Sequence, residues 1–288
     1  MAEPVIGIIF DFDETLGPDT ISFFLEGQGI DVEKFWHEVN DMVKDAWDPP
    51  LAYMDIMLRF SKSGKLDISK KALANAGKKL SLFPGLPEAL SELKNYVKTN
   101  QELKDTKISL EFYIISGGLE EMIRFTKIAP FVDGVFGSNF AYDKNGEPVG
   151  IKSTITFTEK TRYVHGIRKG VGVSDLRNNP YLINDSMPRD MQRIPFPQMI
   201  YLGDGPSDIP CLSAITNNGG TGIGVSAPFG TFKKGYELAR GKRITVGPYT
   251  ANYKSGSDMR KVLEETILRI GLEINAKRKQ NIIKSPSL

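Results

Sequence analysis

The sequence is poor in the features that define several large classes of protein. Its 288 residues include one cysteine, Cys211, so no internal disulfide can form, which suits a reducing compartment. No apolar run approaches the roughly 18 residues that a membrane span requires. The first apolar run, Val5–Phe10, stops at Asp11 and follows no basic segment, so it is not a secretory signal. We therefore expect a cytoplasmic protein with no membrane partner.

The chain also lacks a large excess of charge of either sign. It has 37 basic and 35 acidic residues, a formal net charge of +2. Proteins that hold nucleic acid through its phosphates are usually far more basic, so we expect no nucleic-acid partner. Hydrophobic residues at 40% and charged residues at 25% are ordinary for a globular chain and exclude a disordered or collagen-like one. The composition leaves the number of subunits open.

Three short apolar runs each end abruptly at a polar residue. They are Val5–Phe10 before Asp11, Phe112–Ile115 before Ser116, and Met199–Leu202, which passes through Gly203 into Asp204. Runs of this kind, separated by helical patterns, indicate the buried strands of an α/β fold, a Rossmann-like open parallel sheet with helices on both faces. Ligands bind at the carboxyl ends of such strands, so the three polar residues should meet along one edge.

The segment 17–82 interrupts this pattern with helical periodicity. Helices are expected from near Asp31, over Leu51–Phe60 and over Ser69–Leu80. We interpret the segment as an inserted helical cap over the strand ends; the alternative is a set of ordinary crossover helices. The expected organisation is an α/β core of residues 1–16 and 83–288 with an α-helical cap of residues 17–82.

Three later segments complete the organisation. Val135–Phe140 and Val149–Phe157 read as strands joined by a tight turn at Asn145-Gly146. A helix is expected from beyond Gly256 to about Ile282. The stretch Arg162–Pro197 is longer than a minimal crossover, and the sequence assigns it no role.

Asp11 and Asp13 are the first candidate site residues. Side chains two residues apart in an extended segment share a face, so both carboxylates can point at one substrate. Two adjacent acids repel each other unless a cation or a division of roles separates them. The alternative is a turn that carries two solvated acids.

Asp204 and Asp208 are the second pair of candidates. Asp204 follows a strand, and Asp208 lies four residues on, in the tight loop Gly203–Asp208. With Asp11 they would form an oxygen-rich site that suits Mg²⁺ better than Ca²⁺, because few protein ligands leave room for water and phosphate oxygens. The alternative is an ordinary acidic turn.

Two further elements are suited to an anion. Ser116-Gly117-Gly118 offers a hydroxyl and backbone N–H groups where a strand is expected to give way to a helix, although such a sequence is also an ordinary loop. Lys160 follows Thr158, a plausible helix N-cap, and would reach the site from the first turn of that helix. Lys152 is the competing lysine, but it falls within a strand pattern.

Together these residues resemble the haloacid dehalogenase (HAD) superfamily, and within it the phosphoserine phosphatase-like branch. Its motifs are present in order, as DFDETL at Asp11–Leu16, IISGG at Ile114–Gly118, Lys160, and GDGPSD at Gly203–Asp208. The resemblance implies a Rossmann-like core with a helical cap between the first and second motifs.

The resemblance also implies roles for individual residues. Asp11 would attack phosphorus and form an aspartyl-phosphate, and Asp13 would protonate the leaving alcohol and then activate water. The implied Mg²⁺ ligands are Asp11, the Asp13 main-chain carbonyl, Asp204 and Asp208, the last directly or through water. The implied phosphate-binding residues are Ser116, Gly117 and Lys160.

The expected function is therefore a Mg²⁺-dependent phosphatase acting on a small-molecule phosphomonoester. A phosphomutase with the same nucleophile and a HAD-fold sensor that binds a phosphorylated ligand without turnover are the alternatives. The sequence disfavours phosphoserine as the substrate. The segment after the first motif reads Gly17–Thr20, without the glutamate of the resembled phosphoserine phosphatases, and the expected cap carries one arginine, Arg59.

Overall fold

The chain is built around one seven-stranded sheet. A computed structural model describes residues 4–104, 106–228, 230 and 233–284. The strand order is β4-β3-β2-β1-β5-β6-β7, and every neighbouring pair is parallel except the antiparallel pair β3–β4. The strands are β1 Val5–Phe10, β2 Ser109–Leu119, β3 Gly134–Tyr142, β4 Pro148–Ser153, β5 Met199–Gly203, β6 Thr221–Ser226 and β7 Val246–Thr250. The predicted α/β class with an open, mainly parallel sheet is confirmed.

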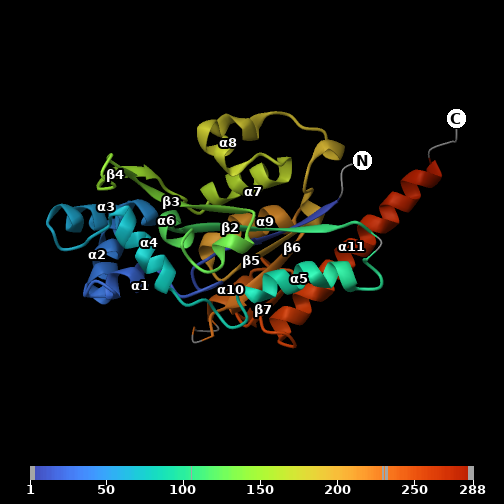
Figure 1. Ribbon diagram of the computed structural model, residues 1–288, viewed down its shortest axis with the longest axis horizontal. Coiled ribbons are helices and arrows are strands. Elements are labelled where there is room, and N and C mark those ends of the chain that lie inside the picture. Colours follow the sequence, from blue (N-terminus) through green and yellow to red (C-terminus); the bar gives the residue numbers. More distant parts are fainter. Residues whose placement is uncertain (1–3, 105, 229, 231–232, 285–288) are drawn as a thin grey trace.

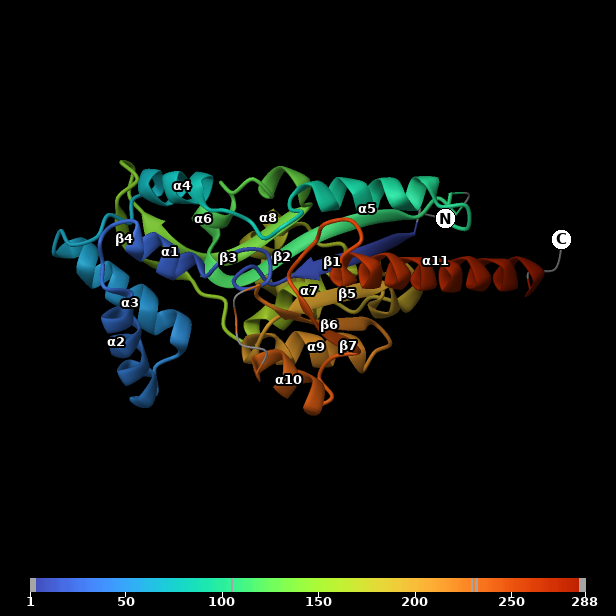
Figure 2. The ribbon, with the colours of Figure 1, turned by 90° about the horizontal axis from the view of Figure 1, so that it is seen from below.

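Helices cover both faces of this sheet (Figures 1 and 2). On one face lie α5 Glu88–Thr99, α6 Glu120–Ile123 and α11 Asp258–Lys284, and on the other α7 Glu159–Lys169, α8 Val173–Asn178, α9 Ile209–Thr216 and α10 Lys233–Arg240. β1 is buried along its whole length because its side chains alternate between the two cores. Ile6, Ile8 and Phe10 enter one core, while Val5 and Ile9 enter the other.

Four helices between β1 and α5 lie beyond the carboxyl edge of the sheet. They are α1 Thr20–Glu26, α2 Val32–Lys44, α3 Pro49–Lys62 and α4 Lys70–Lys79. Figure 2 shows α1, α2 and α3 grouped at this end, while the N-terminus and α11 lie at the opposite end. The Asp31 and Ser69 side chains cap α2 and α4 by accepting backbone N–H bonds from Lys34 and Ala72.

The segment after Gly118 differs from the predicted helix. β2 continues to Leu119, and α6 ends at Ile123. The Thr126 backbone N–H and hydroxyl both donate to the Ile123 carbonyl, at 3.1 and 2.6 Å, so the chain turns there instead of extending the helix. The hairpin at Asn145-Gly146 forms as expected, but β4 ends at Ser153, four residues before the predicted limit.

The stretch Arg162–Pro197, with no role from sequence, covers one face of the sheet. It contains most of α7, then α8 and the short 3₁₀ helices Pro180–Asn184 and Arg189–Met191, and it ends in a third, Phe196–Gln198. Leu176, Ile194 and Phe196 bury their side chains in the core beneath it. Over the residues that the structure describes, no helix has both the length and the apolar surface needed to cross a bilayer.

Candidate active site

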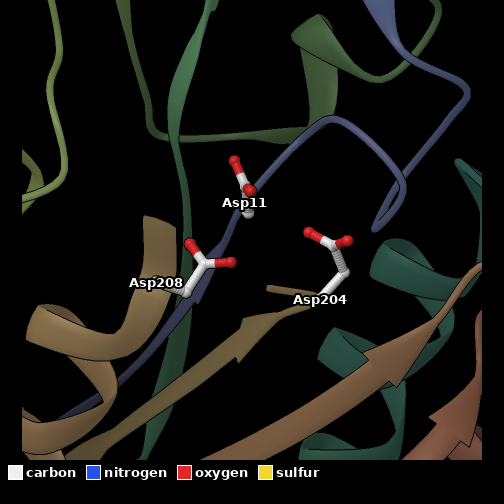
Figure 3. Close-up of side chains that lie close together, drawn as sticks. All are labelled: Asp11, Asp204 and Asp208. Atoms are coloured by element: carbon white, nitrogen blue, oxygen red, sulfur yellow. The ribbon is translucent and has the colours of Figure 1, made fainter. Parts of the chain in front are cut away.

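Asp11 stands at the carboxyl end of the central strand. Its backbone N–H continues the pairing of β1 with β5 by donating to the Leu202 carbonyl at 2.9 Å. Its buried side chain accepts a hydrogen bond from the Phe12 N–H through Oδ1, at 2.8 Å. Asp204 follows β5 and Asp208 ends the next loop, so three acids from two strand ends converge (Figure 3). One carboxylate oxygen from each lies within 4.8 Å of the others.

A buried lysine neutralises part of this cluster. Lys160, in the first turn of α7, places its Nζ 2.9 Å from Asp11 Oδ1 and 2.8 Å from Asp208 Oδ1. Burial lowers the pKa of Lys160, but the two adjacent carboxylates outweigh this effect and raise the pKa above its ordinary value. The ammonium is therefore fixed in its charged form, as an electrostatic group aimed at Asp11.

Asp208, the second carboxylate paired with Lys160, is fully buried. The Tyr201 hydroxyl donates to Asp208 Oδ1 at 2.8 Å, and the Gly205 N–H donates to Oδ2 at 3.4 Å. A Cβ on Gly203 would lie 2.4 Å from the Asp208 carboxyl carbon, so the approach of this side chain requires glycine at 203. Asp208 is thereby held in one orientation beneath Lys160.

Asp13 is held in a tight turn after Asp11. Its Oδ1 accepts from the Thr20 N–H at 2.8 Å, and its Oδ2 accepts from the Ser116 hydroxyl at 3.3 Å. Burial raises the pKa of Asp13 to about 7, repulsion from Asp19 adds to the shift, and the Thr20 hydrogen bond opposes it. Near neutral pH the Asp13 carboxyl can therefore both give and take a proton.

The segment Ser116–Gly118 is held in place by hydrogen bonds within it and by hydrogen bonds from Ser138 and Tyr53. Gly118 N–H donates to Ser116 Oγ at 2.9 Å. The Gly117 carbonyl accepts from the Ser138 hydroxyl at 2.9 Å and from the Tyr53 hydroxyl of α3 at 2.5 Å. A Cβ on Gly118 would lie only 2.9 Å from Asp13 Oδ2. Glycine at position 118 therefore allows the Ser116–Gly118 segment to pack against Asp13. Tyr53 thereby ties α3 to this segment.

A cavity of about 170 Å³ opens onto these groups. It is lined by Asp11, Asp13, Glu14, Asp19, Pro50, Gly117, Ile155, Phe157, Lys160, Asp204, Ser207 and Lys234. Five of the seven residues predicted from the sequence therefore form its wall. The other two, Ser116 and Asp208, lie behind the wall, with polar atoms that bond to Asp13 and Lys160. Lys234 also lines the cavity, with its Nζ 3.4 Å from Asp204 Oδ2, and no motif in the sequence predicted it.

The acidic cluster has the donor set of a hard-cation site. Burial and then repulsion from Asp208 raise the pKa of Asp204 to about 6, with Lys234 opposing. Burial likewise raises the pKa of Asp11, repulsion from Asp208 adds to it, and Lys160 counteracts both. A divalent cation would stabilise the ionised form of these carboxylates, because its charge offsets their mutual repulsion. The donor atoms are all oxygens, which Mg²⁺ prefers. The residues present fit Mg²⁺.

Comparisons with known proteins identify the fold. No protein-family model matches the chain. An uncharacterized protein from Borreliella burgdorferi is 27% identical over 238 residues, which cover 75% of this chain and 80% of that protein. A probable phosphoserine phosphatase from Vibrio cholerae has a TM-score of 0.53 at 15% identity, over 95% of this chain and 67% of that structure. The gene product AF1437 from Archaeoglobus fulgidus has a TM-score of 0.52 at 12% identity, over 92% and 84%.

These similarities and the sequence motifs agree on the class of fold. The chain has the α/β fold of the probable phosphoserine phosphatase from Vibrio cholerae, which agrees with the fold that the resemblance of its motifs to the HAD superfamily implies. At these identities the likeness establishes the fold, and the activity is argued from the site itself.

Proposed function

We propose that the chain is a Mg²⁺-dependent phosphatase that hydrolyses a small-molecule phosphomonoester through an aspartyl-phosphate on Asp11. The observation that carries this proposal is the joint placement of Asp11, Lys160 and Asp13 on the wall of one cavity. A nucleophile, a fixed positive charge and a carboxyl group with a pKa of about 7 are the three protein groups that phosphate-ester hydrolysis requires.

Asp11 is the proposed nucleophile. Its Oδ1 is engaged by Lys160 and by the Phe12 N–H, whereas among the described residues Oδ2 has no such partner. Attack by Oδ2 forms a bond to phosphorus while the bond from phosphorus to the ester oxygen breaks. Lys160, which already balances the charge on Asp11, then lies beside the phosphoryl oxygens and stabilises the negative charge that they share.

Asp13 is the proposed acid and base. Protonated Asp13 gives its proton to the departing alkoxide, and the resulting carboxylate takes a proton from the water that attacks the aspartyl-phosphate. The second step releases inorganic phosphate and restores both aspartates. The hydrogen bonds from Thr20 and Ser116 support this role, because they fix the carboxyl group between the two motifs.

Mg²⁺ would be held by Asp11, the Asp13 main-chain carbonyl and Asp204, with Asp208 completing the acidic cluster. When bound, the ion supplies positive charge that screens the phosphate from the surrounding carboxylates. Asp208 already bonds to Lys160, Tyr201 and Gly205, which supports a contribution through the position of Lys160 or through a water molecule.

The division into a core and a cap is part of the proposal. Asp19 and Pro50, from the inserted segment 17–82, line the cavity together with core residues. A cavity of about 170 Å³ is below the roughly 300–1,000 Å³ of common ligand sites, which supports a substrate little larger than its phosphate group.

The test is phosphate release from a panel of phosphoserine, phosphoethanolamine, phosphocholine, nucleotides and sugar phosphates, with Mg²⁺ and with EDTA. The wild type is compared with Asp11→Asn and with Asp45→Asn, a matched change at an exposed position outside the cavity. We expect metal-dependent release that Asp11→Asn abolishes and Asp45→Asn retains. Release that survives in Asp11→Asn, or no release by folded protein that binds Mg²⁺, would contradict the proposal.

A further inference from the structure

A second, larger cavity lies at the other end of the sheet. Its volume is about 630 Å³. Pro4, which precedes β1, and Gln198, which precedes β5, belong to its wall, whereas Asp11 and Asp204 follow the same two strands. Strands of five or six residues at about 3.3 Å per residue separate the two cavities by about 17–20 Å. Figure 2 shows this end of the sheet, where β1 begins, remote from α1, α2 and α3.

The wall of this cavity is strongly basic, and we call it the basic cleft. Its charged lining residues are Lys169, Arg189, Asp190, Arg193, Lys277 and Arg278. One acid thus faces five bases in a chain whose formal net charge is +2. Glu111 pairs with Arg193, which leaves the positive charge in excess. Such a concentration of charge in a concave site favours an anionic ligand.

Lys169 is an independent indication of an anion. It is the last residue of α7, and only 8% of its surface is exposed. Its ammonium donates to the main-chain carbonyls of Ile183 and Asp185, and among the described residues no ion pair between it and a carboxylate is present. A buried ammonium held by neutral carbonyls alone is costly, so a ligand that brings negative charge to this wall gains binding energy from it.

The remaining lining restricts the kind of anion. Pro4, Met191, Pro195 and Ile274 give the cleft apolar walls beside its charges. The volume falls within the range of small-molecule sites, about 300–1,000 Å³, rather than that of an extended polymer groove. Arginine and lysine are the side chains that bind phosphate oxygens best, the former in a fork and the latter as a point charge.

We propose that the basic cleft binds a small molecule with a pyrophosphate-type group, either free or attached to an apolar or aromatic portion as in a nucleoside polyphosphate. This site is distinct from the candidate active site. The stretch Arg162–Pro197 then has a role, because Lys169, Arg189 and Arg193 all belong to it. α7 joins the two sites, with Lys160 in its first turn and Lys169 at its end.

The test is calorimetric titration of the metal-free protein with pyrophosphate, ATP and adenosine. Lys277→Glu reverses a charge in the cleft wall. Lys279→Glu is its matched control, because the exposed Lys279 lies on the same helix and outside the lining. Lys234→Glu makes the same change in the wall of the candidate active site. All three positions are exposed, so the variants should fold.

We expect pyrophosphate and ATP to bind at one site, at least tenfold more weakly to Lys277→Glu and within about twofold of wild type to the other two variants. Tighter binding of ATP than of pyrophosphate would assign the apolar walls to a nucleoside, and equal binding would assign the site to the pyrophosphate group alone. The proposal is overturned by no binding, by adenosine binding as tightly as ATP, by equal losses in Lys277→Glu and Lys279→Glu, or by a loss confined to Lys234→Glu.

Discussion

The Lys160 ammonium lies between two buried carboxylates, 2.9 Å from Asp11 Oδ1 and 2.8 Å from Asp208 Oδ1. The three residues come from α7, from the end of β1 and from the loop after β5, so one cation joins segments that are far apart in the sequence. Each carboxylate lowers the cost of burying the lysine, and the lysine lowers the repulsion between the carboxylates. This relationship makes Lys160 a determinant of stability as well as a candidate catalytic group.

Lys160→Met should destabilise the metal-free protein at pH 8 by about 3–5 kcal/mol, because it leaves two buried acids facing each other. The pKa of Asp11 is already raised, and removal of Lys160 raises it further. The folded variant then binds a proton that the unfolded chain releases, so its stability rises as the pH falls through that raised pKa. Urea denaturation in EDTA at pH 5 and pH 8 should show a smaller loss at pH 5.

The control for this prediction is Lys234→Met. Lys234 is 58% exposed and approaches Asp204 at 3.4 Å, and exposed pairs of this kind contribute about 1 kcal/mol or less. Equal losses for the two variants, or a loss in Lys160→Met that does not change with pH, would refute the account of Lys160.

Mg²⁺ affinity should depend on pH through Asp204. Its pKa of about 6 means that the metal-free folded protein carries a proton there at pH 5, and this proton must leave before the carboxylate can act as a ligand. We expect the apparent Kd for Mg²⁺ to fall at least about tenfold between pH 5 and pH 7. The thermal shift of the protein, measured over a Mg²⁺ titration at each pH, gives this value. An affinity that is the same at both pH values would show that Asp204 is not a ligand that titrates in this range.

Asp13→Asn should impair the reaction most for substrates whose leaving group must be protonated as it departs. General acid–base catalysis contributes about 10²–10⁴-fold, so kcat for an alkyl phosphate should fall by about that factor. An aryl phosphate with a stable phenolate leaving group, such as p-nitrophenyl phosphate, should lose much less in the first step. The measurement is the ratio of the rates of aspartyl-phosphate formation for the two substrates in rapid-quench experiments. Equal losses for both would exclude proton donation by Asp13.

Tyr53→Phe should loosen the segment Ser116–Gly118. The Tyr53 hydroxyl donates to the Gly117 carbonyl, so its removal should lower the free energy of unfolding by about 1 kcal/mol. It should also lower kcat, because Gly117 lines the cavity. Tyr142→Phe is the matched control, because the Tyr142 hydroxyl is buried and has no hydrogen-bond partner among the described residues. We expect the kcat of Tyr142→Phe to match that of the wild type, with no loss of unfolding free energy. A similar fall in kcat for both variants would mean that the link through Tyr53 does not order the segment.

The sequence predicted the elements whose signals are local. β1 has the predicted bounds, because an unbroken apolar run can be buried on both faces of a parallel sheet. The starts of α2 and α4 follow the side chains of Asp31 and Ser69, which cap them. The order of the motifs also predicted that their residues would converge, since the carboxyl ends of parallel strands share one edge.

The missed elements and residues depend on the tertiary structure. β6 and β7 read TGIGVS and VGPYT, in which glycine and proline break the apolar runs that mark a strand. Tyr201 lies inside the predicted run Met199–Leu202, and its hydroxyl finds Asp208 through the fold of the following loop. Lys234 reaches the cavity from α10, in a segment without a motif. The Ser116 hydroxyl donates to Asp13 from behind the cavity wall, and its binding of phosphate stays a prediction.

The most direct test of the central claim is the identity of the residue that becomes phosphorylated. The protein is mixed with substrate and Mg²⁺, quenched in acid within one turnover, reduced with borohydride and mapped by peptide mass spectrometry. The proposed mechanism predicts that Asp11, and no other residue, is converted to homoserine. With p-nitrophenyl phosphate, whose leaving group needs little protonation, Asp13→Asn should yield more homoserine than the wild type, because water attack on the aspartyl-phosphate is slowed more than its formation. Phosphate release without modification of Asp11, or modification of another carboxylate, would contradict the mechanism.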